Sequence, residues 1–207
     1  MKRAFEDLIR FGRAVADAGL LSSTCGNASV RVGDRLVITA SGSYLGELAE
    51  DDLAVVELAS GRQVSGRKPS MEVGIHRWAY DARPGTEAVL HCQSRAATLL
   101  ACHLQPPASL DFIPEVPAYV RRHAYVPYHN PGSDELAAAV RAALEDPEVT
   151  VVQMTNHGQI IIGAGPEEVV RRATFFELAC WMATQGLPLR TIPEEDIRAL
   201  RDYARDA

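Results

Sequence analysis

Two histidines lie at the ends of apolar stretches of the sequence. If these stretches form strands, the two side chains lie at an edge of the sheet. His91 ends the run EAVLHC, and His157 lies in the turn sequence TNHG between two apolar runs. A neutral imidazole binds zinc and other divalent transition metals. Gln93 shares a strand face with His91, because side chains two apart point the same way, and its amide oxygen can add a weaker ligand. For either histidine alone, the simpler interpretation is a hydrogen-bonded core residue.

One carboxylate in the sequence is a candidate for acid–base chemistry, in addition to these histidines. Glu72 follows Pro69 closely and precedes His76 by four residues. A carboxylate at the rim of a pocket can act as a general acid or base. The structural alternative is a helix first turn, where the dipole favours a negative charge and a residue four positions on can pair with it.

Three short polar segments could hold an anion. They are Gly26-Asn27, Ser41-Gly42 and Ser70, which offer backbone N–H groups and small side-chain donors. Ser70 is expected at a helix N-terminus, where unpaired N–H groups and the dipole favour a phosphate. Each segment taken singly is also an ordinary turn sequence, since glycine, serine and asparagine are common in turns.

Hydrophobic periodicity predicts the elements that carry these residues. We expect helices over residues 4–18, 70–82, 94–104, 133–146 and 166–186, and a charged helix from residue 193 onward. We expect strands in residues 23–42, 53–58, 87–92 and 150–165, with turns at VGD, at residues 59–66 and at residues 156–158. Residues 105–132 hold six prolines and are expected to form loop with short strands. Adjacent hairpins among alternating helices predict an α/β fold, a three-layer α/β/α domain with a mixed, largely antiparallel central sheet.

Composition narrows the classes of function. The 207 residues carry a net charge of -6, 47% apolar residues and no block of lysine and arginine, which fits one soluble domain over residues 1–207 and no nucleic acid partner. No stretch reaches the ~20 apolar residues of a membrane span, and the start lacks the apolar core of a signal peptide. The four cysteines form no C-x-x-C pair, which favours reduced thiols and a cytoplasmic location.

Five segments together resemble the class II aldolase/adducin family, the group that includes L-fuculose-phosphate aldolase. GNASVR, ITASG, KPSMEVGIHRWAY, AVLH and NHG occur in the family's order and spacing, over about residues 5 to 186. The resemblance implies a metal-dependent lyase of carbohydrate metabolism with a small-molecule substrate. It also implies a homotetramer, with a divalent metal ion held by three histidines, typically zinc; manganese, iron and cobalt are further candidates.

The resemblance also implies roles for individual residues. Phosphate binding falls to Asn27, Ser41, Gly42 and Ser70, the catalytic carboxylate is Glu72, and two metal ligands are His91 and His157. Aldol cleavage of a ketose phosphate leaves an enediolate, whose negative charge a dication stabilises while Glu72 moves protons.

The sequence departs from the family pattern at two positions. Gln93 replaces the second histidine of the H-x-H pair, which predicts weaker zinc binding or a shift towards harder ions, and Met71 replaces a small residue of the phosphate segment. The leading hypothesis is aldol cleavage of a small phosphorylated ketose or related sugar acid. Dehydration and decarboxylation within the same family are alternatives, and a non-catalytic, adducin-like binding module is a rival of another class.

Overall fold

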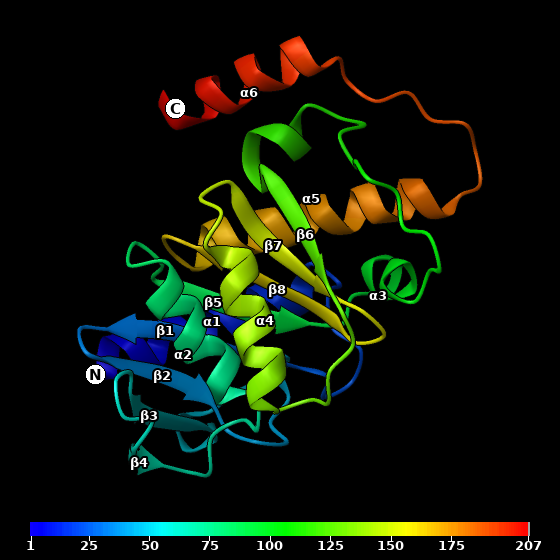
Figure 1. Cartoon of the computed structure of the whole chain (residues 1–207). Coiled ribbons are helices and arrows are strands. Elements are labelled where there is room, and N and C mark those ends of the chain that lie inside the picture. The colour runs from blue at the N-terminus through cyan, green and yellow to red at the C-terminus, as the bar shows by residue number, and fades with distance from the viewer. Residues whose placement is uncertain (207) are drawn as a thin grey trace.

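An eight-stranded sheet forms the middle layer of the molecule, with helices on both of its faces (Figure 1). The computed structural model describes residues 1–206, with side chains up to residue 203. The strand order is β4-β3-β2-β1-β5-β8-β7-β6, and all neighbours are antiparallel except the parallel pair β6 and β7. The strands are β1 (Gly26–Val32), β2 (Arg35–Thr39), β3 (Leu53–Glu57), β4 (Gln63–Gly66), β5 (Ala88–Cys92), β6 (Arg122–Val126), β7 (Val149–Met154) and β8 (Gly158–Gly163).

Two apolar cores separate the sheet from its helical layers. One lies between the sheet and α1, α3 and α5, and the other between the sheet and α2 and α4, which lie in front of the sheet in Figure 1. This arrangement confirms the predicted three-layer α/β/α fold with a mixed, largely antiparallel sheet. The helices are α1 (Lys2–Asp17), α2 (Val73–Ala82), α3 (Arg95–Ala101), α4 (Asp134–Leu144), α5 (Pro166–Thr184) and α6 (Glu194–Asp206).

The helix ends follow the local sequence. Ser133 caps α4, since its side chain accepts a hydrogen bond from the backbone N–H of Leu136. α1 is followed by Gly19 at φ +71°, and Leu20 N–H bonds to the carbonyl of Val15, a glycine-terminated helix end. These interactions explain why the boundaries of α1 and α4 were predictable to within two residues.

Three elements differ from the expectation. The helix predicted from Ser70 begins only at Val73, because Ser70 N–H pairs with Thr39 and the chain first makes a turn. Ser70 therefore lies before the helix rather than in its first turn. The turn-rich segment 59–66 contains the exposed edge strand β4, and residues 116–120 of the proline-rich segment form a π-helical turn.

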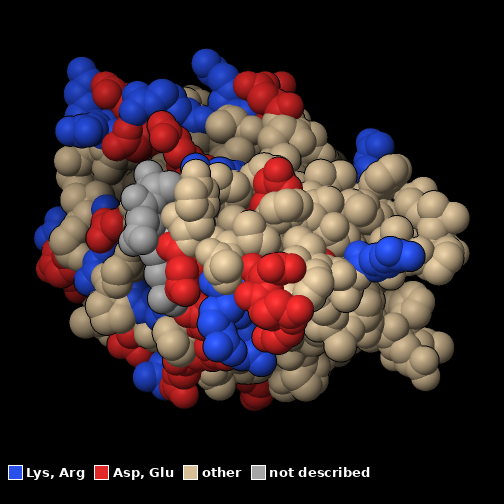
Figure 2. Space-filling view, turned by 90° about the horizontal axis from the view of Figure 1, so that it is seen from above, with Lys and Arg blue, Asp and Glu red and all other residues tan. Residues whose placement is uncertain are grey.

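Charged side chains of both signs cover much of the face seen in Figure 2. Figure 2 shows basic and acidic side chains interspersed on the upper face, with no continuous basic stripe in this view. Among the helices of residues 1–206, none combines the length and apolar character needed to cross a bilayer.

Candidate metal centre

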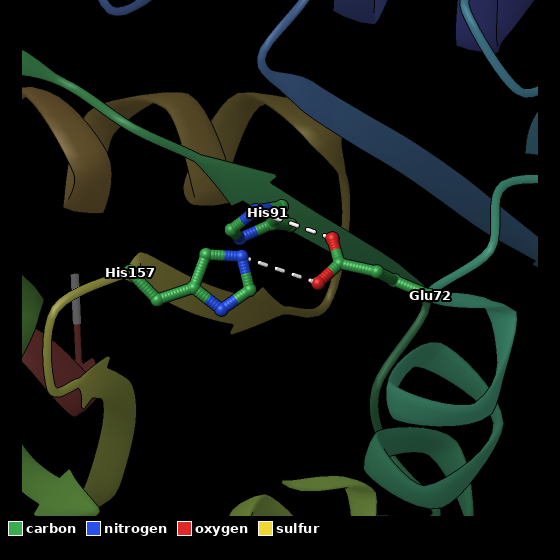
Figure 3. Close-up of side chains that lie close together, drawn as sticks. All are labelled: Glu72, His91 and His157. Carbon is green, nitrogen blue, oxygen red and sulfur yellow. Dashed lines mark ion pairs between the residues drawn. The ribbon is translucent and has the colours of Figure 1, made fainter. Parts of the chain in front are cut away.

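Three residues from separate elements meet at one edge of the sheet. Glu72 immediately precedes α2, His91 lies in β5, and His157 lies in the turn before β8. Glu72 Oε2 is 3.2 Å from His91 Nε2, and Glu72 Oε1 is 3.3 Å from His157 Nε2. Figure 3 shows the carboxylate extending towards both imidazole rings. The structure thus brings together the three residues that the sequence singled out as catalytic carboxylate and metal-ligating histidines.

The tautomer of His91 follows from its hydrogen bond to the main chain. Nδ1 lies 3.1 Å from the carbonyl oxygen of Gln159, which can only accept, so Nδ1 carries the hydrogen. In the neutral ring, Nε2 then presents a lone pair to a carboxylate oxygen of Glu72. Two acceptors at this distance repel each other unless a cation lies between them. A hydrogen bond of this kind, which fixes the ring and its tautomer, is typical of metal-ligating histidines.

His157 is also held in a form that can bind a cation. Burial lowers its pKa below 6.5, nearby His91 lowers it further, and Glu72 acts in the opposite direction. A lowered pKa keeps the imidazole neutral, as a metal ligand must be. Its Nδ1 is buried with no hydrogen-bond partner among the described residues, and its Nε2 faces Glu72 Oε1, which likewise has no hydrogen-bond partner there.

The geometry of the three side chains fits a divalent ion. Their ligand atoms all lie within 4.8 Å of one another, and all three residues are at most 9% exposed. Two ligands bonded at ~2.0 Å to a tetrahedral ion are about 3.3 Å apart, close to the carboxylate–imidazole separations in this site. Two imidazoles and one carboxylate form a donor set used by zinc and by other divalent transition metals.

Gln93 lies beside this cluster, immediately after β5. A methyl group added at Gly158 would lie 2.8 Å from Gln93 Cγ and 3.2 Å from His91 Cε1. Both side chains therefore contact the same glycine, next to His157 in the β7–β8 turn. Cys92, between them, points to the opposite face and is fully buried in the core. The alternation expected from the sequence is present.

The three segments predicted to bind an anion lie close together, next to Glu72. Residues 40–43 form a turn with Gly42 at φ +81°, a conformation that favours glycine at the third position of a type II turn. Ser41 N–H bonds to the carbonyl of Lys68, so this turn lies against the Lys68–Ser70 segment. Ser70 is 6% exposed, and its Oγ accepts the N–H of Glu72, which leaves its own hydroxyl hydrogen for another acceptor. Met71 is 64% exposed and points outward.

Asn27 interacts directly with the carboxylate. Its side-chain Nδ2 donates to Glu72 Oε2 at 3.0 Å, and its Oδ1 lies 2.6 Å from Nε2 of His76. Sequence reasoning proposed Asn27 for phosphate binding and noted His76 only as a helix-face neighbour of Glu72. The spacing of Glu72, His76 and Tyr80, four residues apart, was the available signal for a polar helix face.

Burial of His76 makes the folding free energy pH dependent. Burial, and then the nearby His91, lower the pKa of His76 from 6.5 to about 3. Below pH 6.5 the unfolded chain binds a proton at His76 that the folded chain does not, so stability falls as pH falls. The loss between pH 6.5 and 5 is about 2 kcal/mol from this group. We expect metal-free His76→Gln protein to show a flatter decline than wild type in urea unfolding at pH 7, 6 and 5. Parallel declines would contradict this.

Comparison with known proteins agrees with this fold. The family model for the class II aldolase and adducin N-terminal domain matches residues 6–184. The chain is 28% identical to the 3-oxo-tetronate 4-phosphate decarboxylase of Haemophilus influenzae, over 97% of both chains. It is 32% identical to the L-fuculose phosphate aldolase of Methanocaldococcus jannaschii, over 76% of this chain and 83% of that protein.

A solved structure is similar over almost the whole chain. YgbL from Klebsiella pneumoniae superimposes with a TM-score of 0.88, covering 97% of this chain and 98% of that chain at 28% identity. The similarity thus includes the sheet, both helical layers and the segments that carry Glu72, His91 and His157. On the sequence match and the fold together, the chain belongs to the class II aldolase and adducin family.

Proposed function

We propose that this chain is a divalent-metal-dependent lyase that breaks a carbon–carbon bond in a small phosphorylated hydroxy ketone or sugar acid. The observation that carries the proposal is the convergence of one carboxylate and two imidazoles from three separate elements. His91 and His157, joined by the amide oxygen of Gln93, would hold the ion. A divalent ion there would stabilise the negative charge that develops on the oxygens of an enediolate.

The other residues would bind the substrate and move its protons. The Ser70 hydroxyl, the Ser41-Gly42 turn and the remaining amide hydrogen of Asn27 are proposed to bind the phosphate. This binding would hold the reacting carbons beside Glu72. Because the Glu72 carboxylate is buried beside both imidazoles, it can exchange a proton with the substrate carbon or hydroxyl at that position.

Aldol cleavage remains the leading reaction. In that reaction the bond between the α and β carbons of the ketone breaks, and its electron pair moves towards the ketone oxygen to give an enediolate. The other fragment leaves as an aldehyde after its β-hydroxyl loses a proton. The 32% identity to an L-fuculose phosphate aldolase supports this reaction.

Decarboxylation is the second candidate, because the decarboxylase matches this chain from end to end. In a 3-oxo acid the electron pair of the carboxyl bond moves to the neighbouring ketone, carbon dioxide leaves, and the same kind of enediolate forms. In both reactions Glu72 would then donate a proton to the enediolate carbon. The two candidates differ only in the leaving fragment.

One half-reaction common to both candidates tests the proposal. Protein loaded with Zn²⁺, Mn²⁺ or Co²⁺ should exchange the hydroxymethyl hydrogens of dihydroxyacetone phosphate for deuterium in D₂O, followed by proton NMR. Release of an aldehyde from L-fuculose 1-phosphate, or of carbon dioxide from 3-oxo-tetronate 4-phosphate, then separates the candidates. A protein that binds no divalent ion and catalyses no exchange would instead be a non-catalytic binding module.

Gln93→His tests whether residue 93 faces the ion. Imidazole is a better zinc ligand than an amide oxygen, and the substitution restores the family's H-x-H pair, so we expect zinc affinity to rise by at least about tenfold. Competition with a chromophoric chelator measures the change, and Gln63→His on the exposed edge strand β4 is the control. Equal zinc affinities of Gln93→His and wild type would show that residue 93 points elsewhere.

The predicted oligomeric state and cellular location each have one structural observation in support. Exposed apolar side chains at Leu99, Leu104, Trp181 and Leu187 are consistent with an oligomer such as the expected homotetramer. All four cysteines are free, which supports the expected reducing, cytoplasmic location. Sedimentation velocity would report the number of subunits.

A further inference from the structure

A buried line of polar side chains runs from Glu72 into the core between α2 and β1. On α2, His76 and Tyr80 follow Glu72 at intervals of four residues; on β1, Asn27 and Ser29 are two residues apart. Four helical residues rise about 6 Å and two strand residues about 6.6 Å. The polar side chains of α2 and those of β1 therefore have nearly the same spacing along the interface. Helix and strand groups therefore alternate in one continuous chain of contacts.

Each contact in the line is a hydrogen bond. Asn27 Nδ2 donates to Glu72 Oε2 at 3.0 Å, and Asn27 Oδ1 lies 2.6 Å from His76 Nε2. His76 Nδ1 lies 2.7 Å from Ser29 Oγ, which in turn lies 2.9 Å from the Tyr80 hydroxyl. All five residues are at most 7% exposed, and His76 and Ser29 are fully buried. Water cannot readily replace any member of the line.

The Glu72 carboxylate sets the direction of every bond in the line. Glu72 can only accept, so Asn27 must turn its NH₂ group towards it and its oxygen towards His76. His76 must then carry its hydrogen on Nε2, and Nδ1 must accept from the Ser29 hydroxyl. Burial lowers the pKa of His76 to about 3, so the ring stays neutral and keeps this one-donor, one-acceptor form at ordinary pH. Ser29 Oγ is then left to accept from Tyr80.

We propose that His76 is a positioning residue that, through Asn27, fixes the Glu72 carboxylate between His91 and His157. Without the Nε2–H of His76, the Asn27 amide would lose the partner that determines its orientation. A rotated amide would direct its oxygen at Glu72 Oε2, and two acceptors would then repel each other. The consequence for catalysis rests on the proposed function, whereas the consequence for the orientation of Asn27 does not.

The orientation of Asn27 can be measured in the metal-free protein without substrate. Asn27, Asn130 and Asn156 are the only asparagines in the sequence, and Asn130 and Asn156 are exposed, so ¹⁵N-asparagine labelling yields three side-chain NH₂ pairs. In wild type, one pair should be protected from hydrogen exchange by roughly 100-fold or more relative to the other two, as expected for a buried hydrogen-bonded group. His76→Leu should abolish that protection.

Two further variants separate positioning from general packing. His76→Gln places an amide oxygen and an NH₂ group about where Nδ1 and Nε2 stand, so it should restore the protection of Asn27. His123→Leu replaces a half-buried histidine, which packs against Tyr125 and Phe176 away from Glu72, and should leave Asn27 unchanged. Unaltered protection of Asn27 in His76→Leu would overturn the proposal.

If His76→Leu does not fold, a measurement on the wild-type protein tests the proposed role of His76. Long-range ¹H–¹⁵N spectra of histidine-labelled protein should show His76 as the neutral Nε2–H tautomer from pH 5 to 9. The Nδ1–H tautomer would overturn the proposal, because Nε2 could not then donate to Asn27.

Kinetics of the deuterium exchange supply the readout specific to catalysis. We expect His76→Leu to lower kcat roughly 100-fold, because the carboxylate is misplaced, and to raise KM by a smaller factor, because Ser70 and the Ser41-Gly42 turn remain and only the Asn27 amide is rotated. His76→Gln should stay within about tenfold of wild type. A raised KM with unchanged kcat would assign His76 to substrate binding instead. If wild type itself shows no exchange, the proposed function fails, while the asparagine and histidine spectra still test the hydrogen-bonded line.

Discussion

Glu72→Gln is expected to lower the rate of deuterium exchange and of substrate cleavage by about 10²- to 10⁴-fold, the usual contribution of a general acid or base. The amide is nearly the same size as the carboxylate, so it can still accept from Asn27 with its oxygen. It cannot accept a proton from carbon or oxygen at neutral pH. The two imidazoles keep their places and the amide oxygen can still face the ion, so we expect the fold and a bound ion to be retained.

Three measurements check this expectation together. Circular dichroism reports the fold, metal analysis after gel filtration reports the ion, and proton NMR in D₂O reports the exchange rate. Glu57→Gln is the matched control, because Glu57 ends β3 and pairs with Arg62 far along the sheet from β5, so its activity should equal that of wild type. Exchange at the wild-type rate in Glu72→Gln would show that another group moves the proton.

His91→Ala is expected to abolish measurable binding of zinc at micromolar concentrations. Loss of a partner that merely orients a metal ligand costs about 10- to 100-fold in affinity, so loss of a ligand itself should cost more than about 100-fold. The substitution also leaves the Gln159 carbonyl without the hydrogen bond from Nδ1. We expect a stability loss of about 1–3 kcal/mol from this lost hydrogen bond and the lost packing of the buried ring.

His103→Ala provides the comparison for His91→Ala. His103 is exposed in the loop after α3 and lies outside the metal cluster, so its removal should leave zinc affinity within about twofold. Isothermal titration with Zn²⁺ on protein stripped with a chelator measures all three proteins. If His91→Ala and wild type bind zinc equally well, the ion is held elsewhere and the proposed centre is wrong.

Local sequence signals explain which parts of the fold were predictable. α4 and α5 have long periodic apolar faces and clear starting signals in Ser133 and Pro166, so tertiary contacts only reinforce them. β5, β7 and β8 are fully buried runs rich in Val and Ile, which favour the strand. By contrast, β4 is four exposed residues, held by its hydrogen bonds to β3 rather than by an apolar pattern.

The late start of α2 shows tertiary structure overriding a local signal. Pro69 and Ser70 together look like a helix start, but Ala40 forms a β-bridge with Pro69, and Ser70 N–H bonds to Thr39. This pairing holds residues 68–72 extended or turned, so the Glu72 carboxylate points into the site instead of lying along the first helical turn.

The candidate residues were recognisable from the linear chain, because periodicity and turn chemistry act over a few neighbours. His91 at the end of an apolar strand, His157 in a turn and Glu72 in the first turn of a predicted helix each carried a local signal. Three further features were decided only in the folded molecule. The ligand atoms of these residues lie within 4.8 Å of one another, His91 carries its hydrogen on Nδ1, and Asn27 is hydrogen-bonded to Glu72 and His76. The reason is physical: strand order β1-β5-β8 brings together residues more than sixty positions apart, and hydrogen bonds across those strands, which no local pattern encodes, set their orientation.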